Sequence, residues 1–321
     1  MIRINRIFIV CWMVFVMAAC SHNPPLEKMY TISQSELDEL KLTYYSDYFS
    51  FVGQDENGKV AFAIDNNRGQ DQDTWQADHF LVLHDEKLGW QEVLGNGLYA
   101  NDKKELTTIP DSDFFNFHGT AKTGMKIKSE VNHLELEIEP VITRRENKKG
   151  LSQFTLGSAN AILRWKGREI KGRVIHEFLY LPGFNRLSQK YFGIFKDFHG
   201  IYAMTENNGD FYYHDQKSEV LSPLVGESIG FLFDKNTTLS FDSISSNVKS
   251  RDFTLGFYRW PTGWQGKLIK DEADMSFDLG LTKRNDIANW LIGGFAMGII
   301  NGELLIDGKK VKVYGLGELI I

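Results

Sequence analysis

The sequence repeats itself, which predicts a fold made of two similar halves. With a shift of 141 residues (308 − 167 = 141), residues 167–179 align with residues 308–320. The same shift brings residues 130–136 onto residues 271–277 without a gap. One shift that serves two separated windows indicates an internal duplication.

Each copy has the residue pattern of antiparallel β-structure. Residues 134–139 alternate apolar and charged side chains, the period of two expected when one sheet face is buried and the other is wet. The pairs Asn57-Gly58 and Asp307-Gly308 stand between such runs and tolerate the positive φ of tight hairpin turns. Many short strands at even spacing predict an all-β chain of two tandem antiparallel β-barrels. A β-sandwich in each half is the alternative architecture.

The first twenty residues have the order of a lipoprotein export signal. Arg3 and Arg6 form a basic start, residues 7–19 are uncharged but too short to span a bilayer, and two small residues precede Cys20. We expect Cys20 to become the lipidated N-terminus and to attach the protein to a membrane. Ser21 lacks the acidic character that favours inner-membrane retention, so we expect a periplasm-facing location at the outer membrane of the cell envelope.

These patterns divide the chain into four parts. They are a signal peptide (1–19), a lipidated tether with a short helix (20–43), a first barrel domain (44–182) and a second barrel domain (191–321).

Composition excludes several classes of function. Removal of Arg3 and Arg6 leaves 34 basic residues (36 − 2) against 42 acidic ones, so the net charge moves from -6 to -8. Nucleic acid is therefore not an expected partner. Loss of the signal also removes Cys11, which leaves Cys20 alone and no disulfide. The scattered histidines predict no metal site, and nothing in the sequence calls for a cofactor. The oligomeric state cannot be derived from these patterns.

The chain resembles a known family. Residues 77–82 lead to Gly89-Trp90, and residues 195–200 (Phe-Lys-Asp-Phe-His-Gly) open the second half. With the duplicated β-rich halves, these segments are similar to the tandem lipocalin-like family of bacterial carotenoid 1,2-hydratase (hydroxyneurosporene synthase) and AttH-type predicted secreted hydrolases. The resemblance implies two lipocalin-like barrels that bind an extended apolar molecule, and in the hydratase a hydro-lyase activity on an isolated carbon–carbon double bond.

Two acid–histidine pairs could serve such chemistry. Asp197 and His199, at i and i+2, share a strand face, so they are the candidate catalytic pair if the protein is an enzyme: Asp197 would donate the proton and His199 would orient it. Asp78 and His79 are candidate ligand-binding residues, of which one can face a cavity. A turn-capping role is the alternative for the first pair.

Other residues have weaker signals. Trp90, Trp260 and Trp264 are candidate ligand-binding aromatics, and the last two could equally pack at a domain seam. Glu177 and Glu318 occupy equivalent positions in the two copies, which favours a structural role. Residues 65–73, rich in Asp and Asn, lack the glycine and distal glutamate of a calcium loop and are expected to form a solvated loop.

The leading hypothesis is a lipoprotein that binds an extended apolar or amphipathic ligand, such as a lipid or isoprenoid, at the cell envelope. A hydratase or lyase of the carotenoid-hydratase kind is one alternative. A carbohydrate-binding pair of β-sandwiches, whose tryptophans would stack on sugar rings, is the other.

Overall fold

The computed structural model describes most of both predicted domains. It covers residues 42–71, 74–100, 108–183, 197–218, 221–234, 237–241, 245–253, 259–270, 273–290 and 293–321, with the single positions 33, 35 and 39. The predicted signal peptide and Cys20 lie outside the described residues, as does most of the predicted tether with its short helix.

The first copy forms one antiparallel sheet with the strand order β4-β3-β2-β1-β11-β10-β8-β7-β6; β5 also pairs with β3, and β9 with β10. The strands are β1 (Leu42–Asp55), β2 (Gly58–Asp71), β3 (Thr74–Asp85), β4 (Gly89–Gln91), β5 (Gly97–Ala100), β6 (Asn116–Thr120), β7 (Gly124–Ser129), β8 (Leu134–Ile138), β9 (Ile142–Lys149), β10 (Ser152–Trp165) and β11 (Arg168–Pro182).

The second copy forms a separate sheet with the order β15-β14-β13-β12-β20-β19-β18-β17-β16. Its elements are β12 (Phe198–Thr205), β13 (Asp210–Asp215), α4 (Ser222–Val225), β14 (Ser228–Asp234), β15 (Thr237–Phe241), β16 (Ser245–Phe253), β17 (Arg259–Lys270), β18 (Ala273–Trp290), β19 (Gly293–Ile306) and β20 (Lys309–Ile320). Among the described residues, no helix has the length and apolar character needed to cross a membrane.

The two sheets share their topology and part of their register, which confirms the duplication. In each sheet the first strand pairs with both the second and the last strand. Leu163 pairs with Leu136 in the first sheet, and Leu304 pairs with Phe277 in the second (304 − 163 = 277 − 136 = 141). β18 alone takes the place of β8 and β9, which share β10 as their partner.

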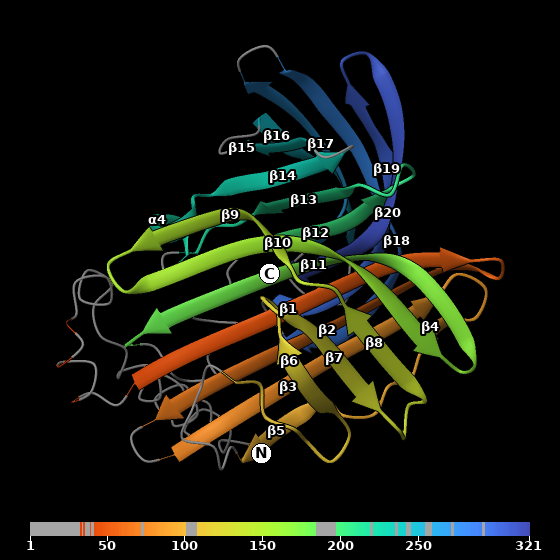
Figure 1. Ribbon diagram of the computed structural model, residues 1–321. Coiled ribbons are helices and arrows are strands. Elements are labelled where there is room, and N and C mark those ends of the chain that lie inside the picture. Colours follow the sequence, from red (N-terminus) through yellow and green to blue (C-terminus); the bar gives the residue numbers. More distant parts are fainter. Residues whose placement is uncertain are drawn as a thin grey trace, which may run out of the picture.

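Both sheets curl (Figure 1), and each has an inner core of its own. Phe51, Phe62 and Leu136 belong to the inner core of the first sheet, and Trp264 and Ile300 to that of the second. In the part of the chain that the structure describes, no ladder joins the edge strands β4 or β5 to β6, or β15 to β16. The predicted tandem barrels are therefore two curled sheets, each open along one edge. Each half is one hydrogen-bonded sheet, unlike the two packed sheets of a sandwich.

A third core joins the outer faces of the two sheets. It includes Tyr48 and Leu179 from the first sheet and Tyr202 from the second. A buried ion pair crosses the same interface: Arg173 on β11 donates from Nε and Nη2 to the carboxylate of Asp210 on β13, at 2.9 and 2.5 Å. The sheets are therefore held together by apolar packing and by a bidentate charge-assisted contact.

Candidate functional site

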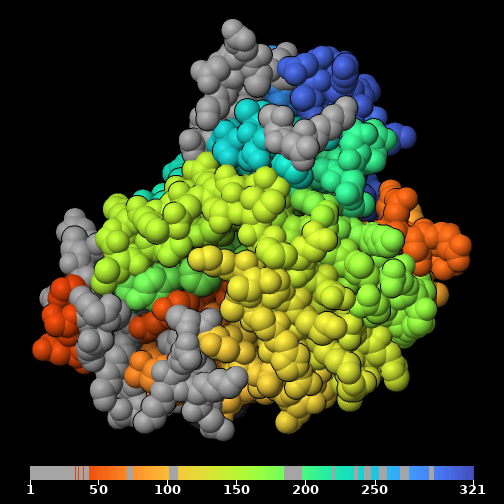
Figure 2. Space-filling view, in the orientation of Figure 1, coloured from red at the N-terminus to blue at the C-terminus, as the bar shows by residue number. Residues whose placement is uncertain are grey.

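A pocket of about 670 Å³ opens into the inner side of the first sheet, and we call it the first-sheet pocket. It lies between β9, β10 and β11 on one side and the β6–β7 turn on the other. Figure 2 shows a recess there, between the yellow surface near residue 120 and the yellow-green surface near residue 150. Its volume falls in the range of small-molecule sites.

The floor of the pocket is polar because charged side chains occupy inward positions of the strands. Asp47 and His176 line the pocket, and Arg68 lies fully buried behind them. Asp47 is two residues from Phe49 and His176 is two residues from Val174, and both of these core side chains point inward. Arg68 is four residues from Ile64, another inward core side chain of its strand. Since side chains alternate between faces along a strand, this spacing points all three polar groups inward.

Asp47 joins the other two polar groups. Its Oδ2 accepts a hydrogen bond from Nη2 of Arg68 at 2.6 Å, and its Oδ1 lies 2.6 Å from Nε2 of His176. The imidazole also stacks on the Phe49 ring, with centroids 4.5 Å apart. Although burial opposes it, the charge of Arg68 and the hydrogen bonds of Arg68 and His176 hold the pKa of Asp47 below its ordinary value. The floor thus carries an ionised, doubly bonded carboxylate that fixes the histidine ring.

The walls above this floor mix apolar side chains with the polar side chains of threonines, Gln153 and Glu146. Phe178 lines the pocket next to His176, and Ile109 and Met125 line its opposite side. The aromatic row continues from Phe178 to Tyr45, 6.0 Å away between ring centroids, and then to Tyr180, stacked at 4.6 Å. The lining therefore offers an apolar patch around Phe178, Ile109 and Met125 beside convergent polar groups, a combination that suits an amphipathic organic ligand.

A second polar centre lies outside the pocket, at the interface between the sheets. Oε2 of Glu177 accepts hydrogen bonds from the hydroxyls of Tyr202 at 3.1 Å and Tyr212 at 2.8 Å. The Tyr212 hydroxyl also lies 2.7 Å from Nδ1 of His214. Burial raises the pKa of Glu177 to about 7, although both phenols oppose the shift, and burial lowers the pKa of His214 to about 3. This centre therefore holds a carboxyl group whose ionisation is disfavoured by its burial.

Solved structures share this arrangement of two curled sheets. A candidate AttH protein of Nitrosomonas europaea superposes with a TM-score of 0.54 at 10% identity, over 88% of this chain and 93% of that one. Kievitone hydratase from Nectria haematococca gives a TM-score of 0.56 at 9% identity, over 86% and 88%. CghA gives 0.51 at 10% identity, over 88% and 89%. The chain has the tandem lipocalin-like fold. No protein-family model and no curated protein matches the sequence.

The lipocalin-like fold separates Asp78 from His79. His79 lies inside the first sheet, where its ring meets those of Tyr99 and Phe117 at 5.1 and 5.2 Å. Burial lowers the pKa of His79 to about 4, so the ring is neutral, and neither nitrogen has a hydrogen-bond partner within the described residues. Asp78 projects from the opposite face, where burial raises its pKa to about 6. Neither residue lines the first-sheet pocket.

Asp197 and His199 lie in different surroundings. Asp197 precedes β12 in a positive-φ conformation, and its side chain, 42% exposed, is 3.9 Å from Nζ of Lys217. His199 is buried inside the second sheet, where Nε1 of Trp264 is 3.5 Å from its Nδ1. The structure thus brings His199 together with Trp264 and leaves Asp197 at the surface.

The three candidate tryptophans do not share one site. Trp260 and Trp264 are buried in the second inner core, so neither presents an open face to a sugar ring. Trp90 lies at the seam between the sheets, where its Nε1 donates to the backbone oxygen of Lys283 at 2.5 Å and its ring meets His84 at 5.0 Å.

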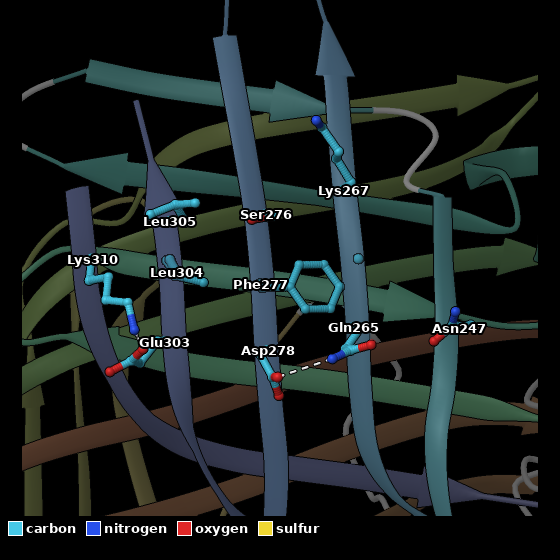
Figure 3. Close-up of a pocket in the computed structure, with 11 residues that line it drawn as sticks. Asn247, Gln265, Lys267, Ser276, Phe277, Asp278, Glu303, Leu304, Leu305 and Lys310 are labelled. Carbon is cyan, nitrogen blue, oxygen red and sulfur yellow. Dashed lines mark hydrogen bonds and ion pairs between the residues drawn. The ribbon is translucent and has the colours of Figure 1, made fainter. Parts of the chain in front are cut away.

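A second hollow, of about 470 Å³, lies on β16 to β20 (Figure 3). The view shows polar side chains from neighbouring strands, including Gln265, which donates to Asp278 at 3.1 Å, and Lys310, which pairs with Glu303 at 2.7 Å. The polar groups in both contacts already satisfy one another. Within the described residues, no group of three or more histidine, cysteine, aspartate or glutamate side chains is placed to hold a metal ion.

Sequence reasoning did not select Asp47, Arg68 or His176 as site residues. The expectation of a solvated loop at 65–73 was wrong for its first part, because β2 extends to Asp71 and the side chains of residues 65–68 are buried. The sequence pattern that could have identified them is a charged residue spaced by two or four positions from apolar residues of the same strand, which places it on the buried face. It becomes decisive only once the sheet register places three such residues side by side.

Proposed function

We propose that the protein binds an extended apolar or amphipathic ligand in the first-sheet pocket. The observation that carries this proposal is the combination of the apolar Phe178 ring with the polar floor at Asp47 and His176, in a pocket of about 670 Å³. The fold shared with an AttH-like protein and with a hydratase agrees with the handling of such ligands.

We propose that this binding takes place at the cell envelope, with lipidated Cys20 as the anchor. The support is the sequence of the first twenty residues. In addition, β1 begins at Leu42, so the chain enters the first sheet at the end where Tyr45 stacks on Tyr180. Cys20→Ser should abolish incorporation of labelled palmitate. Unchanged labelling would contradict the anchor.

Truncation of Phe178 should weaken ligand binding. The full chain carrying Cys20→Ser is purified without detergent, and co-purified small molecules are identified by native mass spectrometry and organic extraction. Phe178→Ala should then raise the dissociation constant of the recovered ligand by roughly tenfold to a hundredfold, because a buried aromatic side chain contributes about 1.5–3 kcal/mol to apolar contact.

A matched substitution outside the pocket controls for a general loss of structure. Phe233 is half-buried on β14 in the second sheet, with the Arg144 guanidinium 3.7 Å from its ring centroid. Phe233→Ala should leave the dissociation constant unchanged. Equal weakening by both variants would place the ligand elsewhere.

A second candidate function is hydration of an isolated double bond at Glu177. Alkene protonation needs a neutral acid in apolar surroundings, and burial raises the pKa of Glu177 to about 7 within the core shared by the two sheets. Asp197, the acid proposed from the sequence, has a side chain that is 42% exposed. Isoprenoids with isolated double bonds should then incorporate oxygen from labelled water, and Glu177→Gln should abolish this incorporation while Asp197→Asn retains it. The reverse pattern would restore Asp197 as the proton donor.

A further inference from the structure

We propose that the floor of the first-sheet pocket binds the hydroxyl group of a neutral amphiphile, a long-chain alcohol or phenol, through Nδ1 of His176. This inference rests on the proposed function, because it assumes that the pocket holds an amphiphile, and it adds the chemical class of that ligand. It follows from the tautomer of the histidine, the charges of the lining and the position of the polar floor.

The contact with Asp47 fixes the tautomer of His176. Asp47 is ionised and accepts the Arg68 hydrogen bond through Oδ2. A carboxylate has no proton to donate, so at the 2.6 Å contact Nε2 of His176 must be the donor. In the neutral ring Nδ1 then carries a lone pair and accepts hydrogen bonds. No group of the described residues forms a hydrogen bond with Nδ1.

Two contacts also fix the orientation of the His176 ring. His176 is held at Nε2 by Asp47 and against its face by Phe49, with an interplanar angle of 18°. A ring fixed at both places loses little rotational freedom when a ligand binds at Nδ1, so the acceptor is preorganised. The adjoining Phe178 offers an apolar surface to whatever the hydroxyl is attached to.

The charges around the floor of the pocket disfavour an anionic ligand. The carboxylates lining the pocket are Asp47 and Glu146, and Arg68 behind them is fully buried in its contact with Asp47. Lys122, the cationic side chain of the lining, lies on the exposed β6–β7 turn at the rim. A fatty acid or phosphate headgroup at the floor would meet an acceptor nitrogen and like charges, which disfavours its binding. A hydroxyl donor meets neither obstacle.

The test compares four ligands with one ten-carbon chain: decyl alcohol, decyl methyl ether, decanoate and decylamine. Calorimetric titration of the full chain carrying Cys20→Ser gives the dissociation constants. We expect the alcohol to bind roughly tenfold more tightly than the ether, which has no O–H donor, and more tightly than decanoate. His176→Phe retains a ring to stack on Phe49. In this variant the dissociation constant of the ether divided by that of the alcohol should fall from about ten to about one. Phe178→Ala should weaken alcohol and ether by similar factors and leave the ratio unchanged.

The outcomes separate the subsite from the proposed function. Equal affinity for alcohol and ether in the native protein would overturn the hydroxyl subsite while leaving a pocket for apolar chains. Tightest binding of decanoate would do the same and would point to the headgroup at Lys122. Tightest binding of decylamine would also overturn it and point to Asp47 or Glu146. Failure of all four ligands to bind, or binding that Phe178→Ala leaves unchanged, would overturn the proposed function and the subsite together.

Discussion

Replacing Asp210 with alanine is expected to lower the free energy of unfolding by about 3–5 kcal/mol, the cost of leaving one member of a buried ion pair without its partner. Asp210 is fully buried, and its carboxylate accepts two hydrogen bonds from the Arg173 guanidinium of the other sheet. After the substitution the guanidinium retains Asn160 Oδ1, at 2.5 Å, but no carboxylate at this contact. Urea denaturation followed by tryptophan fluorescence measures the change.

Two further variants show whether the loss comes from the unpaired charge. The double variant Arg173→Met with Asp210→Leu removes both charges and should recover most of the lost stability, because apolar residues of similar size can replace a buried pair without penalty. Lys310→Ala breaks the exposed pair with Glu303 and should leave the denaturation midpoint unchanged. A small effect of Asp210→Ala, comparable with that of Lys310→Ala, would show that the pair does not stabilise the interface.

The fold was predictable from the sequence because period and repeat are local properties. The alternation at residues 134–139 identifies a strand with one buried face, and the structure places β8 there with Leu136 inside. The shift of 141 residues reappears as the same strand register in both sheets. The packing of the two outer faces was not predictable in this way, since it depends on contacts such as that between Arg173 and Asp210, 37 positions apart.

The site was less predictable because its groups come from separate strands. Asp47 and His176 are 129 positions apart, and only the pairing of β1 with β11 brings them together. Asp197 and His199 satisfied a spacing rule for shared strand faces, but β12 begins at Phe198, so Asp197 lies in the preceding bend. The short spacing in the sequence therefore pointed to Asp197 and His199, which the fold separates. The sheet register brings Asp47 and His176 together, although no short motif contains both.

Glu177 should make the stability of the native protein decrease as the pH rises from about 4.5 to about 7. Burial raises the pKa of this carboxyl from 4.5 to about 7 in the folded state, so over this interval the folded protein binds a proton that the unfolded chain has released. The stabilisation is fully present below pH 4.5 and is lost as the pH rises through 7. A shift of this size corresponds to about 3 kcal/mol, at about 1.4 kcal/mol per pH unit.

The difference between the native protein and Glu177→Gln isolates this effect from every other titrating group. Glutamine is close to a protonated glutamate in shape and stays neutral, so the variant should gain about 3 kcal/mol relative to the native protein between pH 4.5 and pH 8, measured by denaturation across that range. Glu169 is an exposed carboxylate of the same strand. Glu169→Gln should leave the dependence of the free energy of unfolding on pH as it is in the native protein. Parallel curves for the native protein and Glu177→Gln would mean that Glu177 is ionised throughout. In that case the hydroxyls of Tyr202 and Tyr212, both donating to Oε2, would have to outweigh its burial.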